Sequence, residues 1–122
     1  TVVINPPDGD MRAYLRSLEK LLAEDLRILA PGHGYLIGAA HKELRRLIAH
    51  RLARERKVIQ GLQRLREASI EELLPLVYDD VPARIHHVAA RSLAAHLDKL
   101  AAEGAVRAAA QRYSLVESRP AP

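Results

Sequence analysis

The sequence predicts a mainly α-helical fold with a small amount of β structure. Leucine and isoleucine recur at helical spacing in several long stretches, and short β-branched runs stand next to Pro- and Gly-rich turns. The 122 residues are 48% hydrophobic and 28% charged, which is the balance of a folded globular protein. Because there is no cysteine, a disulfide framework, a thiolate metal site and a cysteine nucleophile are excluded.

The first forty residues predict one strand–helix–strand unit. Residues 1–5 are a β-branched run that ends at a Pro-Pro turn. Asp10 stands at the expected N-cap of a helix over residues 11–24, where its carboxylate can accept from the free N–H groups of the first turn. Residues 26–30 are a second strand candidate. Such a βαβ unit leaves most of its apolar surface uncovered, so we do not expect it to be a domain alone.

Residues 41–117 predict three helices followed by a β-hairpin. The first helix spans 41–67; a capping box at 69–72 begins the second, which Pro75 limits to about two turns. The third spans 83–103 and ends at a glycine, and β-prone pieces at 105–107 and 113–116 form the hairpin. This element order is that of a winged helix, which is evidence for fold rather than for function.

Positive charge is concentrated in the long helix. The net charge is +4, yet residues 42–66 alone carry nine basic and two acidic residues. Arginine suits bidentate contacts to phosphate or carboxylate, so this helix is a candidate for nucleic-acid or interdomain contacts, with a solvated helix face as the alternative. The candidate residues are Arg45, Arg46, His50, Arg51, Arg54, Glu55, Arg56 and Lys57. The aromatic content of 3% offers little surface for stacking single-stranded bases.

His33 is the sharpest chemical signal in the sequence. It lies in a loop with Pro31, Gly32 and Gly34, directly after the second strand candidate, where the glycines allow a tight turn. Imidazole is the commonest protein ligand for a catalytic divalent metal, and a surface turn histidine is the alternative. One histidine does not make a metal site.

Four motifs together resemble the C-terminal part of a metallo-β-lactamase-fold hydrolase. They are Gly-Asp-Met at 9–11, Tyr-Leu-x-Ser-Leu at 14–18, Ile-Leu-x-Pro-Gly-His-Gly at 28–34 and His-Arg-x-x-Arg-Glu at 50–55. The resemblance is to the β-lactamase-like protein 2 subgroup, in which a winged-helix domain follows the hydrolase domain, and it covers residues 1 to about 106. It implies that residues 1–40 are the C-terminal βαβ piece of an αββα metallo-β-lactamase fold.

The resemblance also implies a chemistry. His33 maps onto the last metal ligand of the family, whereas the His-x-His-x-Asp-His run, the third histidine and the bridging aspartate have no counterpart in this chain. The intact protein is then expected to hold two divalent metals, zinc being the first candidate, and to hydrolyse an ester, a thioester or an RNA phosphodiester. The 122-residue segment alone is expected to be inactive and to bind no metal tightly.

Three interpretations follow for the whole chain. The first is a segment of a metal-dependent hydrolase: a hydrolase remnant at 1–40, a docking or substrate-gating winged helix at 41–117, and a disordered tail at 118–122. The second is a stand-alone winged-helix module that binds nucleic acid or regulates. The third is an interaction module that buries its sheet edge against a partner or a second copy. The expected partners are the upstream hydrolase domain, RNA or another nucleic acid, and a homodimer mate.

The expected cellular location is the cytoplasm. No apolar run approaches the ~20 residues of a membrane span, and the start lacks the features of a signal peptide. Because the chain has no initiator methionine and opens inside a β-branched run, we expect it to be cut from a longer protein.

Overall fold

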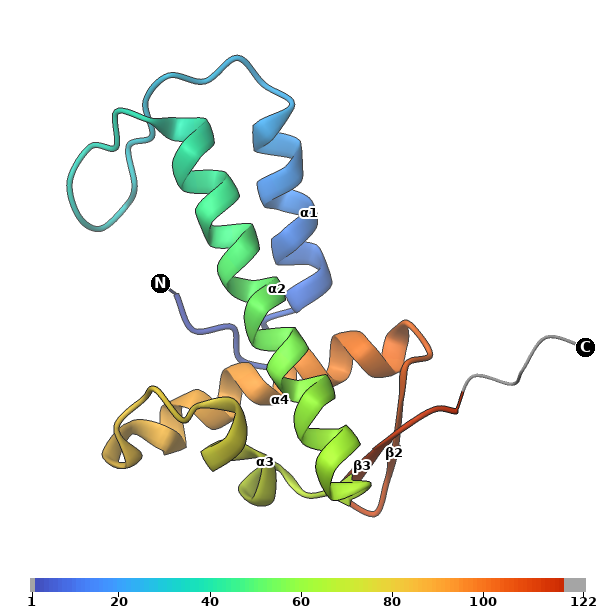
Figure 1. Cartoon of the computed structure of the whole chain (residues 1–122). Helices are drawn as coiled ribbons and strands as arrows, with labels where there is room; N and C mark the ends of the chain where they lie inside the picture. The colour runs from blue at the N-terminus through green and yellow to red at the C-terminus, as the bar shows by residue number, and fades with distance from the viewer. Residues whose placement is uncertain (1, 118–122) are drawn as a thin grey trace, which may run out of the picture.

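The computed structural model describes residues 2–117, and it is mainly helical with one small antiparallel sheet (Figure 1). The described elements are, in chain order, α1 (Met11–Leu22), α2 (Ala40–Leu65), β1 (Glu67–Ala68), α3 (Ile70–Val77), η1 (Ala83–Ile85), α4 (His86–Ala102), β2 (Val106–Ala109) and β3 (Arg112–Leu115). The predicted fold class, mainly α with little β, is confirmed.

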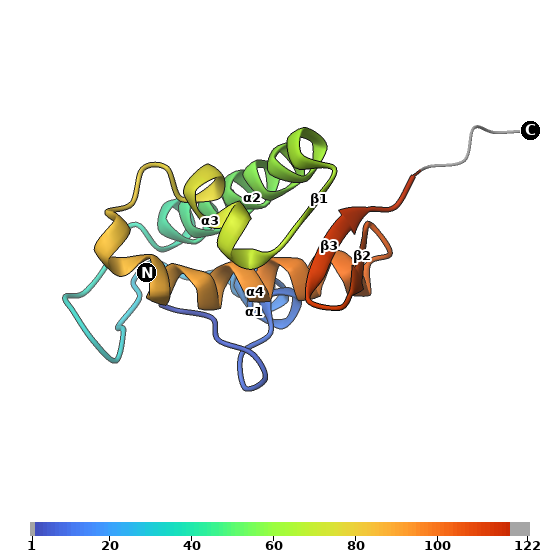
Figure 2. The same ribbon diagram turned by 90° about the horizontal axis from the view of Figure 1, so that it is seen from below.

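Helix α2 connects the two ends of the molecule. Figure 1 shows α1 antiparallel to the N-terminal half of α2, while α3, α4 and the sheet surround its C-terminal half. Seen from below, α4 runs across the molecule (Figure 2), and it contacts α1 as well as α3. The winged-helix segment and the N-terminal residues therefore pack directly against each other.

The predicted winged helix is confirmed, and it contains one strand more than the sequence indicated. Strand β3 lies between β1 and β2, and both pairings are antiparallel. The two-residue β1 joins the hairpin through the pairs Glu67 with Ser114 and Ala68 with Tyr113. The core beneath this sheet consists of Val58, Leu62, Ala68, Leu73, Val77, Tyr78, Leu93, Leu97, Leu100 and Val106.

A second, smaller apolar cluster fastens the N-terminal residues to the winged helix. Ile4, Met11 and Leu15 are buried against Ala95 of α4. Asp10 caps α1 as predicted, since its carboxylate accepts from the Ala13 N–H at 2.8 Å. The cap fixes the start of α1, and α1 places Met11 and Leu15 on the same face, one helical turn apart.

The two strands of the expected βαβ unit are not formed among the described residues. Residues 2–5 pair with no strand, and in the stretch 26–30 only Leu29 pairs, in an isolated antiparallel bridge to Ile37. A β-branched run becomes a strand only beside a neighbour with free backbone groups, and residues 2–117 offer none there. The helix of that unit is present as α1.

The capping box at the start of α3 differs in detail from the predicted one. The Ser69 hydroxyl oxygen accepts from the Glu72 N–H at 3.2 Å, as expected. The Glu72 carboxylate accepts from the Ser69 hydroxyl and from Arg112, at 3.2 and 2.8 Å.

Among residues 2–117, no helix is long and apolar enough to cross a membrane. The tail predicted at 118–122 lies outside the described residues, and the predicted domain limits at 40 and 117 stay predictions.

Candidate functional site

The loop that contains His33 stands away from the winged helix. Figure 1 shows the chain between α1 and α2 projecting beside the N-terminal end of α2. Paired backbone hydrogen bonds of 2.9 Å between Leu29 and Ile37 close the loop. Gly34 has φ +97°, a conformation that disfavours any side chain, so a glycine is required at this turn. The His33 side chain is exposed at the resulting tip.

Residues 2–117 contain no group of three His, Cys, Asp or Glu side chains placed to hold a metal ion. A catalytic zinc site needs about three protein ligands and an open position for water. An exposed imidazole in a closed loop fits the role of one such ligand. The described part of the chain thus offers one candidate ligand and not a complete metal site. The assignment of His33 as that ligand stays a prediction.

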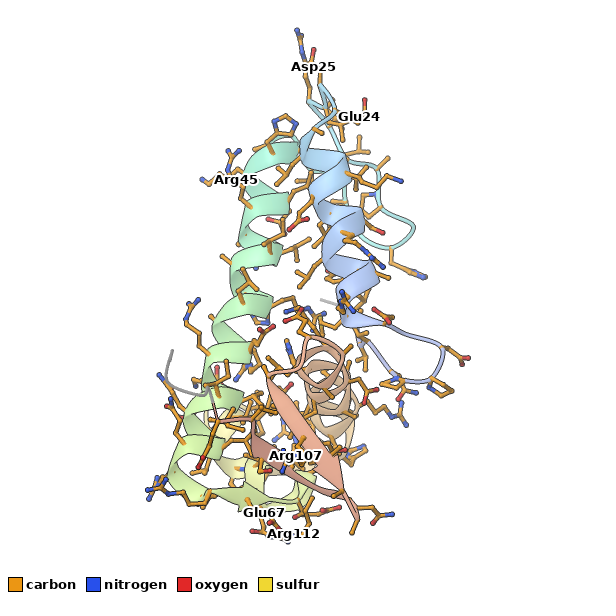
Figure 3. All side chains as sticks on the ribbon, turned by 90° about the vertical axis from the view of Figure 1, so that its right-hand side faces the viewer. Glu24, Asp25, Arg45, Glu67, Arg107 and Arg112 are labelled. Atoms are coloured by element: carbon orange, nitrogen blue, oxygen red, sulfur yellow. The ribbon has the colours of Figure 1, made fainter. Side chains whose placement is uncertain are left out.

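Helix α2 carries the eight residues predicted for nucleic-acid or interdomain contacts, and the structure separates them into outward and inward groups. Arg45 and Arg56 are exposed, and Figure 3 shows Arg45 projecting away from the helix. Arg46 forms an ion pair with Glu43 one turn earlier, at 2.5 Å. Hydrogen bonding to that guanidinium lowers the pKa of Glu43.

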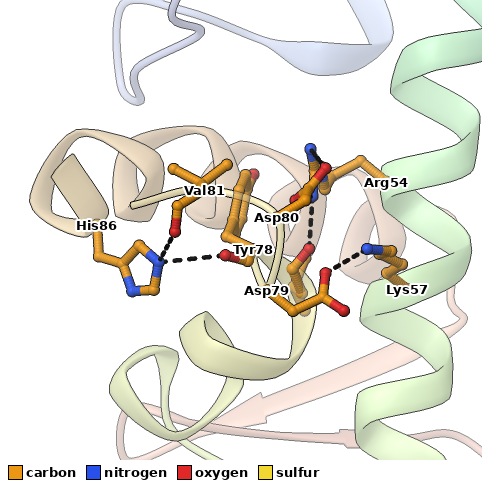
Figure 4. Close-up of polar contacts among 8 residues, drawn as sticks. Arg54, Lys57, Tyr78, Asp79, Asp80, Val81 and His86 are labelled. Atoms are coloured by element: carbon orange, nitrogen blue, oxygen red, sulfur yellow. Dashed lines mark hydrogen bonds and ion pairs between the residues drawn. The ribbon is translucent and has the colours of Figure 1, made fainter. Parts of the chain in front are cut away.

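Arg54 and Lys57 bind the acidic turn that follows α3 (Figure 4). The Arg54 guanidinium donates to the Val77 carbonyl and to Asp80, both at 2.7 Å, and lies over the Tyr78 ring at 4.5 Å from its centroid. Lys57 pairs with Asp79. Hydrogen bonding to these two cations lowers the pKa of Asp79 and of Asp80. The two basic side chains therefore join α2 to α3.

Glu55 and Arg51 point toward α4 and the N-terminal segment. Glu55 accepts from Lys99 at 2.8 Å, and Lys99 also pairs with Glu103 at 2.9 Å. Burial opposes the charge of Lys99, but the hydrogen bonds to the two carboxylates raise its pKa. Arg51 is only 5% exposed; it donates to the Val2 carbonyl at 2.5 Å and lies 5.2 Å from the centroid of the Tyr14 ring.

His50 lies beside this cluster on α2 and is partly buried. Burial, together with the positive charges of Arg51, Arg54 and Arg46, lowers the pKa of His50. The imidazole is therefore neutral at pH 7. It lines a pocket with Arg51 and Arg54 rather than facing the His33 loop.

Comparison with known proteins shows which proteins the chain is similar to. A family model described as the β-lactamase-associated winged-helix domain matches residues 69–113. The β-lactamase-like protein 2 homologues of Drosophila melanogaster and Caenorhabditis elegans are each 30% identical to this chain, over 100 and 97 residues. These matches cover 80% of the chain but 34% and 33% of the relatives, so the chain spans about a third of their length.

Comparison with solved structures points to the same group of proteins. A metallo-β-lactamase family protein from Thermus thermophilus matches with a TM-score of 0.72 and 26% identity, over 87% of this chain and 33% of its own. The chain corresponds to the C-terminal part of a β-lactamase-like protein. A β-lactamase domain protein from Burkholderia ambifaria has the same TM-score and the same coverage at 20% identity, which supports the fold alone.

The predicted resemblance to the β-lactamase-like subgroup is thus confirmed, as is the winged helix. What sequence reasoning missed in this β-lactamase-like segment is the set of partners of the basic residues, namely Tyr14, Tyr78, Asp79, Asp80 and the Val2 carbonyl. Two adjacent aspartates directly after a short helix are a signal that could have been matched to the basic run. No sequence pattern indicates that a backbone carbonyl will bind Arg51.

Proposed function

We propose that this segment belongs to a metal-dependent hydrolase, to which it contributes His33 as a metal ligand and the winged helix as a docking module. The observation that carries the proposal is the exposed His33 at the tip of a closed glycine-containing loop, in a chain matched to β-lactamase-like relatives. Metallo-β-lactamase-fold proteins form a hydrolase superfamily, and the name of the Thermus neighbour supports divalent metals in the intact protein. Esters, thioesters and RNA phosphodiesters are the candidate substrates.

His33 would supply one imidazole to the metal, and the other ligands would come from outside the described residues. A divalent metal, when bound, supplies activation of a water molecule. The contribution of this chain is to hold the imidazole: the Leu29–Ile37 bridge closes the base of the loop, and Gly34 allows the turn at its tip. Of the two histidines of α2, His50 lines another pocket, and the ring of His41 is hydrogen-bonded to the Glu24 carbonyl at 2.7 Å.

A docking role for the winged helix is supported by the way the N-terminal residues pack on it. Ile4, Met11 and Leu15 are buried against Ala95 of α4, and Arg51 binds the Val2 carbonyl. In this proposal the winged helix holds the chain that leads into the His33 loop, and thereby sets the position of the imidazole.

The same contacts weigh against nucleic-acid binding by the basic helix. Arg46, Arg54 and Lys57 already pair with carboxylates, and Arg51 is buried. One flank of α4, the helix that would enter a groove in a DNA-reading winged helix, is covered by α1. Titration with duplex DNA and short RNA at about 50 mM salt tests this alternative, since phosphate contacts are strongest at low salt.

The test of the hydrolase proposal is metal content. In the full-length protein that contains this segment, His33→Ala is expected to lower bound zinc, measured by plasma mass spectrometry, and to lower hydrolysis of a chromogenic ester. His87→Ala is the matched control, because His87 is an exposed histidine on α4. Unchanged metal content in His33→Ala would contradict the assignment, whatever the activity of the variant.

A further inference from the structure

A pocket of about 230 Å³ lies between the N-terminal segment, α2 and α4, apart from the His33 loop. Its apolar walls are formed by side chains of the turn before α4 and of α4 itself. Its polar lining residues are His50, Arg51, Arg54, Tyr78 and Ser92. Val2 and Val3, which stay largely exposed, stand at its edge. Drug-sized ligands occupy pockets of roughly 300–1,000 Å³, so this one suits a smaller molecule.

Arg51 is a buried cation with no acidic partner among the described residues. One guanidinium nitrogen binds the Val2 carbonyl, the group lies over the Tyr14 ring, and the buried Nε has no hydrogen-bond partner. A buried charge is strongly unfavourable unless a counter-charge is paired with it. The other two buried or half-buried cations nearby do have one: Arg54 binds Asp80, and Lys99 binds Glu55.

Tyr78 adds a second unsatisfied group to the same pocket. The residue is buried, and its hydroxyl has no hydrogen-bond partner in the described part of the chain. Burial raises the pKa of Tyr78, so the hydroxyl keeps its proton and can donate. A buried hydroxyl without a partner is unfavourable, and an incoming acceptor would satisfy it.

The walls around these donors are apolar. Val81, Ile85, Val88 and Ala89 line the pocket. Arg54 also lines it, but its guanidinium is paired with Asp80, which is not a lining residue. An inorganic phosphate would find one lining guanidinium without a carboxylate partner, that of Arg51, because Arg54 is paired with Asp80. It would also leave the apolar walls uncovered. A single negative charge on a small branched hydrocarbon satisfies both sides of the pocket.

We propose that this pocket binds an organic carboxylate with a short apolar body, held by the Arg51 guanidinium and the Tyr78 hydroxyl. The carboxylate oxygens accept from the two donors, and the hydrocarbon lies on Val88 and Ala89. The site uses neither His33 nor a metal ion, so its test does not depend on the proposed hydrolase activity.

The experiment is a titration of the 122-residue chain, followed by proton–nitrogen correlation NMR at pH 7, with isovalerate, isovaleramide and inorganic phosphate. Isovalerate is expected to give saturable shifts centred on Tyr78 and Val88. The uncharged amide, which has nearly the same shape, should bind about tenfold more weakly or worse, because it lacks the charge-assisted bond. Equal binding of acid and amide, absence of saturable shifts with isovalerate, or tighter binding of phosphate at the same residues would each overturn the proposal.

Variants assign the donors. Arg51→Gln should weaken isovalerate binding about tenfold or more, whereas Arg56→Gln, which removes an exposed charge from the same helix, should leave it unchanged. Tyr78→Phe deletes only the hydroxyl, and Ala89→Leu fills the apolar wall; both should weaken binding. If Arg51→Gln fails to fold, these two variants decide the question, and full affinity in both would overturn the proposed site.

Discussion

The His33 loop and the winged helix are both rich in apolar residues, yet they use them in opposite ways. In the loop region, Tyr35 is 94% exposed, Leu36 71% and Ile28 60%. In the winged helix, Leu73, Leu93 and Leu97 are completely buried. The winged helix thus carries a core of its own, whereas the loop region is held by the Leu29–Ile37 bridge and a few further backbone contacts.

This difference shows that apolar content alone does not identify the residues that stabilise a fold. Apolar side chains stabilise in proportion to the area that they remove from water, and the exposed ones of the loop remove little. Patches of exposed apolar residues often mark interaction sites, which agrees with the proposal that the loop faces the metal-binding part of a hydrolase. Substitutions in the loop and in the winged helix test whether the two regions contribute unequally to the free energy of unfolding.

The largest difference is expected from truncating leucines. Leu97→Ala should lower the free energy of unfolding by about 3 kcal/mol, because it removes a fully buried side chain and leaves a cavity. Leu36→Ala, the matched change in the loop, should alter it by less than about 0.5 kcal/mol. Urea unfolding followed by circular dichroism measures both. Similar losses in the two variants would show that the loop is part of the core.

A smaller but pH-dependent effect is expected from His96 of α4. It is fully buried, and neither ring nitrogen has a hydrogen-bond partner among residues 2–117. Burial lowers the pKa of His96 to about 3, with further contributions from the positive charges of Arg51 and Lys99. The unfolded chain takes up this proton near pH 6.5 while the folded chain does not, so stability falls as the pH drops below that value.

From this group alone we expect a loss of about 1.6 kcal/mol between pH 6.5 and about pH 5. His96→Leu should remove this part of the pH dependence, as measured by urea unfolding at both pH values. His87→Gln is the control, because it removes an exposed histidine from the same helix and should keep the full dependence. An unchanged pH dependence in His96→Leu would mean that the buried imidazole is protonated in the folded state.

The sequence predicted the winged helix well because each of its elements has a local signal. Apolar residues repeat at helical spacing along α2, Ser69 begins α3, and Gly104 ends α4 with φ +78°. Strand β1 was missed because two residues are too few to show a pattern. Its partner β3 is more than forty residues away, and pairing over such a distance leaves no local trace.

The candidate site was predicted only in part, for a different physical reason. His33 stood out because glycines surround it, and its exposure follows from the loop. The surroundings of Arg51 could not be predicted, since they bring together the Val2 carbonyl, a tyrosine of α1 and the pocket-lining Tyr78, which follows α3. The strand expected at residues 1–5 failed because a β-branched run specifies extended backbone but not the neighbour that it must pair with.

Backbone conformation gives the next test, with an effect of about 1 kcal/mol. Gly104 follows α4 in the left-handed region, so Gly104→Ala should destabilise the winged helix by about that amount. Gly32 of the loop has open space around its Cα and no such φ, so Gly32→Ala should leave the free energy of unfolding nearly unchanged. Thermal and urea unfolding of the two variants check this pair. An equal loss in both would place the loop within the same cooperative unit as α4.

The smallest effect is expected at the tip of the wing, where Ala110 and Gln111 both have positive φ, at 51° and 61°. A two-residue hairpin turn of this kind favours Asn-Gly, so the double change Ala110→Asn and Gln111→Gly should raise the free energy of unfolding by about 0.5 kcal/mol. The gain appears in global unfolding only if the wing unfolds together with the helices. Val106 of β2 is buried in the winged-helix core, which ties the wing to them. A gain in the free energy of unfolding, measured with urea, would therefore show that the wing unfolds together with the winged-helix core, although its tip is exposed. No gain would show that the wing, like the His33 loop, contributes little to global stability.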